Sequence, residues 1–177
     1  FVFRTDNHQK LIKASSQFKK PIINGLSDIS HPCQVIADMF TLKKKFNSFE
    51  GLTISWFGDM NNVLFSYFEF IQLFPSINLN LFTNKEIYQK NIKNFPKINN
   101  LNFYDEIDES AIKLSDCITT DVYTSMNDNS DQMKESKLIK FQINQKLMDL
   151  TSDKCVFTHC LPANIGSEVT EEVINSE

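Results

Sequence analysis

Residues 53–82 read TISWFGDMNNVLFSYFEFIQLFPSINLNLF, and this stretch decides the class of fold. Apolar side chains run through Thr53–Phe57 and again through Ile77–Phe82, which is typical of short buried strands. Between them, Asn62–Phe74 carries apolar residues in a helical pattern. A strand, a helix and a second strand in succession predict a right-handed βαβ unit, in which the two strands run parallel.

The same alternation continues on both sides of this unit. Further strands are expected at Phe1–Arg4, Pro21–Ile23, Leu101–Tyr104, Cys117–Thr120 and Cys155–Thr158. Further helices are expected at Asp6–Phe18, Pro32–Phe46, Asn84–Ile92, Glu106–Leu114 and Ser136–Leu150, and one more begins near Thr170. This order predicts an α/β fold, a three-layer parallel sheet with helices on both faces.

The composition excludes several classes of function. The chain has 177 residues, and 18 Lys and Arg against 22 Asp and Glu give a net charge of −4. This mild acidity offers no basic surface to a nucleic acid or an anionic membrane. The apolar run 63–74 is interrupted by Ser66, Glu69 and Gln72, so it falls short of the ~20 residues that span a bilayer. We therefore expect no nucleic-acid partner and no membrane span.

Glycine and cysteine usage narrows the choice further. The 4 glycines are never closer together than seven positions, which excludes a glycine-rich loop that cradles phosphate. The 4 cysteines show no CxxC spacing, so we expect free thiols and a cytoplasmic protein. The sequence begins at Phe1 without an initiator Met and stops at Glu177 just after a helix start, which leads us to expect a piece of a longer chain.

Ligands of parallel α/β sheets bind beyond the carboxyl ends of the strands. The segments to search are therefore the loops that lead from strand to helix. They are Asn24–His31, Gly58–Asn62, Asp121–Asp131 and His159–Val169. All four are rich in side chains that form hydrogen bonds.

Each of these loops ends or begins with a distinctive motif. The motifs are, in chain order, His31-Pro32-Cys33-Gln34, Gly58-Asp59-Met60-Asn61-Asn62, Asp121-Val122-Tyr123-Thr124-Ser125-Met126 and His159-Cys160-Leu161-Pro162-Ala163. Together they resemble the ornithine carbamoyltransferases, and the resemblance extends from Arg4 to Thr170. It implies a Rossmann-like ornithine-binding domain together with the tail of a second α/β domain that binds carbamoyl phosphate.

The resemblance implies that Arg4, His31 and Gln34 hold carbamoyl phosphate. Donors aimed at a carbonyl oxygen stabilise the oxyanion that develops when an amine attacks, and each is typically worth ~3–4 kcal/mol. Taken alone, His31 is better explained as a residue of the helix-cap region than as a catalytic one.

The ornithine residues implied by the resemblance are Asn62, Asp121, Ser125, Met126 through its backbone, Cys160 and Leu161. An α-carboxylate needs donors and an α-ammonium needs an anionic acceptor. Three of these residues also have a structural interpretation, Asn62 as a helix cap, Asp121 as a turn residue and Ser125 as a solvated side chain.

Cys160 is counted with His31 and Arg4 as catalytic, because the resemblance places it near the reacting amine. It is not expected to be a nucleophile, since neighbours on an extended segment point to opposite sides and His159 is then poorly placed as its base. The spacing of Cys155, His159 and Cys160 matches no closed zinc site. We expect no metal and no cofactor.

The implied reaction joins the carbamoyl group of carbamoyl phosphate to the δ-amine of L-ornithine, giving citrulline and phosphate, in arginine biosynthesis. The implied division is 1–33 for the end of the carbamoyl-phosphate domain, 34–48 for a connecting helix and 49–177 for the ornithine domain. The phosphate-binding Ser-Thr-Arg-Thr segment of the family does not occur here, so we expect this chain alone to be inactive. The complete protein is expected to be a homotrimer.

Three alternatives stay open. Met60 and Asn127 stand where the family usually has small residues, and such changes concern amine specificity more than reaction class. A carbamoyltransferase for putrescine or a similar amine is the nearest alternative. Aspartate carbamoyltransferase fits less well, because Cys160-Leu161-Pro162-Ala163 and Asp121 suit a cationic amino acid. The third is a non-catalytic α/β module that binds an amino acid.

Overall fold

The larger part of the molecule is built on one sheet in which every strand runs parallel. The structure is a computed structural model that describes residues 1–124 and 132–176. The sheet has 5 strands in the order β5-β4-β3-β6-β7. Their bounds are β3 (Thr53–Phe57), β4 (Asn78–Phe82), β5 (Leu101–Tyr104), β6 (Cys117–Thr120) and β7 (Val156–His159).

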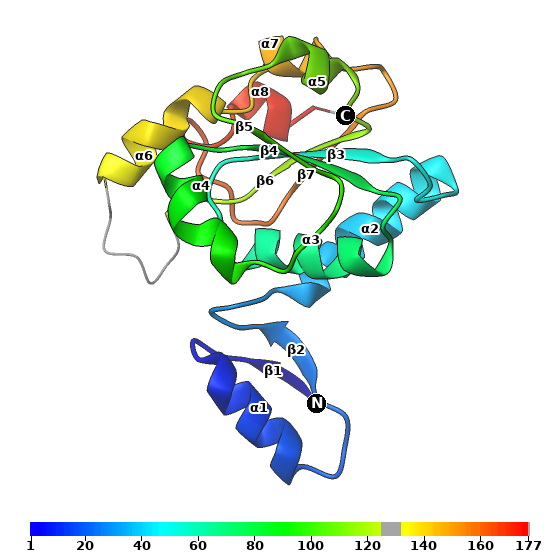
Figure 1. Cartoon of the computed structure of the whole chain (residues 1–177), viewed down its shortest axis with the longest axis vertical. Coiled ribbons are helices and arrows are strands. Elements are labelled where there is room, and N and C mark those ends of the chain that lie inside the picture. Colours follow the sequence, from blue (N-terminus) through cyan, green and yellow to red (C-terminus); the bar gives the residue numbers. More distant parts are fainter. Residues whose placement is uncertain (125–131, 177) are drawn as a thin grey trace.

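Helices cover both faces of this sheet (Figure 1). On one face lie α2 (Pro32–Phe46) and α3 (Asn62–Leu73), which pack against each other. The opposite face is covered by α5 (Glu109–Lys113), α7 (Gln145–Met148) and α8 (Glu171–Ile174). Three further helices, α4 (Lys85–Asn91), its continuation η1 (Ile92–Asn94) and α6 (Gln132–Leu138), lie toward one end, and η2 (Ile139–Phe141) follows α6.

The core is divided by the sheet into two apolar clusters, as alternating side chains require. Ile54, Trp56 and Leu81 belong to the cluster under α2 and α3. Phe57 and Phe82 belong to the cluster on the other face, where their rings stack 4.4 Å apart. The result is the three-layer α/β fold that the sequence predicts.

A small N-terminal lobe is attached to the large one through α2. It contains two parallel strands, β1 (Val2–Arg4) and β2 (Ile23–Leu26), joined by α1 (His8–Gln17). Figure 1 shows this lobe beside the helices α2 and α3. Among the described residues, no helix has both the length and the apolarity that a membrane crossing requires.

The predicted order of elements is confirmed, with two corrections. The second strand is Ile23–Leu26 rather than Pro21–Ile23, because its partner β1 pairs with residues up to Leu26. A single helix over Ser136–Leu150 is wrong. The Ile143 carbonyl instead accepts from the backbone N–H of Thr170, and the Ile143 N–H donates to the backbone of Glu168, which forms an isolated β-bridge. This bridge separates η2 from α7, whose N-cap is Asn144.

Gly58, at the start of the loop after β3, lies so close to the Tyr123 ring that a residue with a Cβ would not fit there. Its φ is +119°, and a Cβ placed there would lie 2.6 Å from Cε1 of the buried Tyr123. We expect Gly58→Ala to reduce the free energy of unfolding by about 2–4 kcal/mol, from backbone strain and overpacking together. Urea unfolding measures this loss.

The matched control is Gly51→Ala. Gly51 also has a positive φ, +74°, but nothing lies within 4 Å of a Cβ built there. This control should lose only about 1 kcal/mol. Equal losses in the two variants would contradict a steric role for the contact with Tyr123.

Candidate functional site

A cleft of about 1160 Å³ opens at the carboxyl edge of the sheet and is lined by residues from both lobes. Parallel strands all end at one edge, so the loops that follow them meet there. The small lobe contributes Arg4, Ser27 and Asp28, and the start of α2 contributes His31. The large lobe contributes residues from the loops after three strands and from α4 and α6, including Asp59, Asn61, Asn62, Lys90, Asp121, Lys134, Cys160, Leu161 and Pro162.

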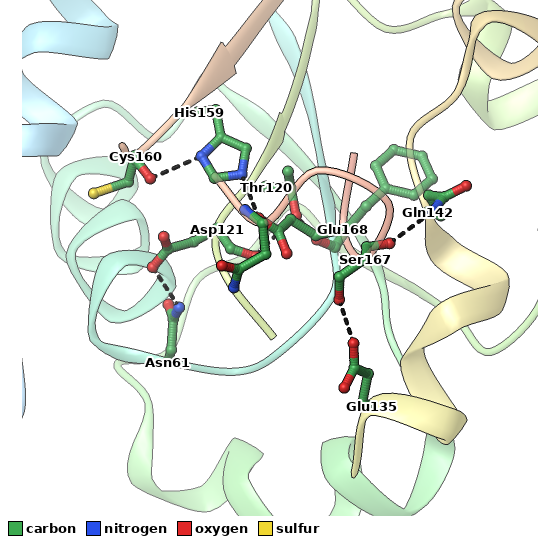
Figure 2. Close-up of polar contacts among 11 residues, drawn as sticks. Asn61, Thr120, Asp121, Glu135, Gln142, His159, Cys160, Ser167 and Glu168 are labelled. Atoms are coloured by element: carbon green, nitrogen blue, oxygen red, sulfur yellow. Dashed lines mark hydrogen bonds and ion pairs between the residues drawn. The ribbon is translucent and has the colours of Figure 1, made fainter. Parts of the chain in front are cut away.

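The loop after β3 is held in place by its own side chains. The Asn61 side-chain oxygen accepts from the backbone N–H groups of Val63 (3.0 Å) and Leu64 (3.1 Å), which caps α3. The Asn61 amide nitrogen donates to the Asp121 carboxylate at 2.7 Å. One side chain therefore fixes both the start of a helix and the orientation of a carboxylate in the cleft (Figure 2).

Asp121, directly after β6, is a buried carboxylate at the cleft. Burial raises the pKa of Asp121 to about 6, although the backbone N–H of Val122, the nearby His159 and the Asn61 amide each favour the ionised form. A buried anion is costly when unpaired and attracts a cation strongly. The position is therefore suited to an ammonium group of a ligand.

Arg4 and His31 lie close together on another side of the same cleft. Arg4 ends β1, and His31 stands at the N-cap position of α2, where its backbone N–H donates to Ser66 Oγ at 2.8 Å. Burial and the charge of Arg4 lower the pKa of His31. A neutral imidazole can donate one hydrogen bond, and a guanidinium beside a helix N-terminus favours an anion.

Cys160 and Leu161 follow β7 and form another wall of the cleft. The His159 ring is bonded to the Cys160 carbonyl at 2.7 Å and to the buried Glu168 carboxylate at 3.2 Å, and the Cys160 thiol points away from the ring (Figure 2). Burial, with the negative charge of Asp121, raises the pKa of Cys160 to about 12. A protonated thiol is a weak nucleophile, which favours a contact role over covalent catalysis.

Most of the site residues predicted from sequence meet at this cleft. Arg4, His31, Asn62, Asp121, Cys160 and Leu161 all line it. Gln34 is not among the lining residues, and its amide nitrogen instead donates to Asp38 at 3.1 Å. Ser125 and Met126 lie outside the described residues.

Other polar groups of the cleft were not predicted. Lys134 of α6 forms an ion pair with Asp59 at 2.6 Å, and the two side chains are only 20% and 8% exposed. Asn61 was not predicted either, although an Asn directly before an apolar helical run is a typical N-cap signal. Within the described ranges, no group of three or more His, Cys, Asp or Glu side chains could hold a metal ion.

The fold and the cleft define a two-lobed α/β protein, with Arg4 and His31 on one side of the cleft between the lobes and Asp121 on the other. Two family models match the chain. The carbamoyl-phosphate-binding domain of aspartate/ornithine carbamoyltransferases matches residues 1–44, and their aspartate/ornithine-binding domain matches residues 50–177. The chain therefore belongs to the aspartate/ornithine carbamoyltransferase family.

Individual relatives agree with this assignment. Ornithine carbamoyltransferase from Nitrobacter winogradskyi is 38% identical over 98% of this chain and 57% of its own length. The solved structure of ornithine carbamoyltransferase from Thermus thermophilus superimposes with a TM-score of 0.82 at 30% identity, over 99% of this chain and 57% of that one. Aspartate transcarbamoylase from Trypanosoma cruzi, at 19% identity and a TM-score of 0.75, shares the fold. The chain spans little more than half the length of the relatives it matches.

Because the pKa of Asp121 is raised in the folded protein, ionisation of this carboxyl lowers the free energy of unfolding. Its folded-state value of about 6 lies above the ordinary 3.8, so ionisation of Asp121 costs stability as pH rises through this interval and the full cost is present above pH 6. We expect Asp121→Asn to raise the free energy of unfolding by about 1–3 kcal/mol at pH 8 and by about half as much at pH 5.

Urea unfolding of parent and variant at the two pH values measures this difference. Asn keeps an oxygen that can accept from Asn61, so the variant removes the charge and retains the hydrogen bond. Equal free energies of unfolding for the parent and Asp121→Asn at pH 8 would contradict the expectation that the ionised Asp121 destabilises the fold.

Proposed function

We propose that the protein is an ornithine carbamoyltransferase, which transfers the carbamoyl group of carbamoyl phosphate to the δ-amine of L-ornithine. The observation that carries the proposal is the polarity of the cleft. Arg4 and His31 line it from the small lobe and the start of α2, and Asp121 lines it from the large sheet. An anionic substrate and a cationic one would thus be held side by side, each by a group of opposite charge.

In this proposal the carbamoyl phosphate is bound by Arg4, His31 and Gln34. The guanidinium of Arg4 neutralises developing negative charge, and the neutral His31 donates to the carbonyl oxygen of the carbamoyl group. The start of α2 supports this placement, because the positive end of the helix dipole favours an anion. Arg4 and His31 are close enough for the charge of Arg4 to lower the pKa of His31.

Ornithine would occupy the other side of the cleft. Asp121 would pair with its α-ammonium, and the Asn62 amide would donate to its α-carboxylate after leaving Ser27 O, to which it now donates at 2.7 Å. Cys160 and Leu161 would contact the end of the side chain that carries the δ-amine. Ser125 and the backbone of Met126 complete the proposed set.

The chemical step joins nitrogen to the carbamoyl carbon. The lone pair of the neutral δ-amine attacks this carbon, a tetrahedral intermediate forms with its oxyanion near Arg4 and His31, and the bond from carbon to the phosphate oxygen breaks. The nitrogen loses one proton, which the leaving phosphate accepts. Holding both substrates in one cleft supplies the proximity that accelerates such a reaction. An ammonium cannot attack, so the rate should rise with pH until the δ-amine is deprotonated.

The remaining parts of the proposal depend on the resemblance to the family. They are the production of citrulline for arginine biosynthesis, a cytoplasmic location, a homotrimeric assembly, and a division into 1–33, 34–48 and 49–177. The chain also lacks the Ser-Thr-Arg-Thr segment expected to cradle phosphate. We propose that the 177 residues by themselves do not turn over substrate and that the complete gene product does.

The test is carbamoyl transfer by the complete gene product, measured as amine-dependent release of phosphate from carbamoyl phosphate with ornithine, putrescine or aspartate supplied in parallel. We expect turnover with ornithine. Equal or faster turnover with putrescine would reassign the amine, turnover with aspartate alone would place the protein in the other branch of the family, and no turnover with any amine would favour a binding module.

The role of Asp121 gives a second, sharper test of this assignment. Asp121→Asn should raise the KM for ornithine at least about a hundredfold, because a buried charge pair with the α-ammonium is lost, and should change the KM for carbamoyl phosphate less than about threefold. The control is Asp116→Asn, which removes a carboxylate at the opposite edge of the sheet, where Asp116 accepts from the backbone of Thr53 at 2.9 Å. Equal effects on both KM values would contradict the assignment.

A further inference from the structure

The ion pair between Lys134 and Asp59 lies in the cleft, and the proposed reaction gives it no role. Both residues line the cleft, and Lys134 Nζ lies 2.6 Å from Asp59 Oδ2. Both side chains are largely buried. Removing two charged groups from water is costly and contributes little net stability, so this pair calls for an explanation of another kind.

The loop after β3 places Asp59 close to the carboxylate that is proposed to bind the substrate ammonium. Asp59 precedes Asn61 by two residues, which span at most about 7 Å. The Asn61 amide in turn donates to Asp121 at 2.7 Å. The backbone of Asp59 is also fixed, because its carbonyl accepts from the indole N–H of the buried Trp56 at 2.9 Å. Asp59 and Asp121 are therefore neighbouring carboxylates of the cleft.

Lys134 sets the net charge of this part of the cleft. When Asp59 is ionised and Lys134 is protonated, the pair is neutral, and the ionised Asp121 supplies the net negative charge of the three side chains. Removal of the Lys134 ammonium would add one negative charge beside the proposed ammonium site. Charges at this separation interact strongly where burial lowers the local dielectric constant.

The amines that could accept the carbamoyl group differ in net charge. When the attacking amine is neutral, ornithine still carries an α-ammonium and an α-carboxylate, so the molecule is neutral overall. Putrescine in the same state carries one ammonium and no carboxylate, so it is a cation. An added negative charge in the cleft would attract the diamine and repel the carboxylate of the amino acid.

We propose that Lys134 is a specificity-determining residue, which neutralises Asp59 and thereby makes the cleft select an α-amino acid over a diamine that lacks the carboxylate. This inference rests on the proposed function. Selection of the amine would thus depend on an ammonium of α6 that need not touch the substrate.

Lys134→Met tests the proposal in the complete gene product, because methionine keeps an unbranched side chain and removes the charge. The quantity to measure is the inhibition constant of putrescine against ornithine, divided by the KM for ornithine. We expect this ratio to fall at least about tenfold in Lys134→Met, because the added negative charge favours the cation. Lys134→Arg keeps the charge and should leave the ratio within about threefold of the parent.

The double variant Asp59→Asn with Lys134→Met separates the effect of charge from that of packing. It removes both members of the ion pair, so the net charge of the cleft returns to that of the parent while the contact stays lost. We expect the ratio to return to within about threefold of the parent. A ratio in the double variant as low as in Lys134→Met would overturn the inference.

Lys137→Met is the matched control on the same helix. Lys137 Nζ lies 2.6 Å from Glu86, but these two side chains are 35% and 75% exposed, so water screens their charges. This control should leave the ratio within about threefold of the parent. If Lys134→Met weakens ornithine and putrescine equally, Lys134 has only a structural role, and the inference is overturned while the proposed function stands. If the parent protein transfers no carbamoyl group to ornithine, both are overturned.

Discussion

The parallel direction of all 5 strands in the large sheet is the constraint on which the site depends. Each strand must be followed by a crossover that returns the chain to the opposite edge, so every loop that leaves a carboxyl end reaches the same side. The loops after β3, β6 and β7 come from distant segments of the sequence, yet Asn61, Asp121 and Cys160 line one cleft. Had any one of these strands been antiparallel, its loop would lie on the far edge of the sheet.

The second constraint is the cost of burying charged groups, and three buried carboxylates differ in the hydrogen bonds that offset this cost. Asp121 lines the cleft and holds one oxygen against the Asn61 amide. Asp38 is bonded to a donor on each oxygen. Glu168 receives His159 and the backbone of Asn164 on one oxygen, and among the described residues its second oxygen has no partner. Of these three carboxylates, Asp121 is the one that lines the cleft, and its burial there is the basis of the role proposed for it.

Sequence patterns predicted the architecture because apolar alternation and the residues that start a helix depend only on near neighbours in the chain. Apolar alternation located β3, β5 and β6 at their observed bounds, and Pro32 correctly marked the start of α2. The single helix predicted over Ser136–Leu150 failed because Ile143 pairs with Val169, a contact between distant segments that periodicity cannot reveal. Of the described site residues predicted from the sequence, all but Gln34 line the cleft. The Asn61–Asp121 and Lys134–Asp59 contacts were not predicted, because they depend on how the loops meet in space.

The two sides of the cleft are positioned by different parts of the fold, and this has a consequence for binding. Asp121 is fixed within the large sheet, whereas Arg4 is carried by the small lobe through the pairing of β1 with β2. The loop between β2 and α2 is tied to α3 by two hydrogen bonds, from Asn62 to Ser27 O and from the His31 backbone to Ser66. His31 is therefore held in place by contacts with the large lobe, whereas Arg4 is held in place by the small lobe. An anion held by both would link the lobes. In the proposed function, binding of carbamoyl phosphate would then stabilise the arrangement of the cleft that receives the amine.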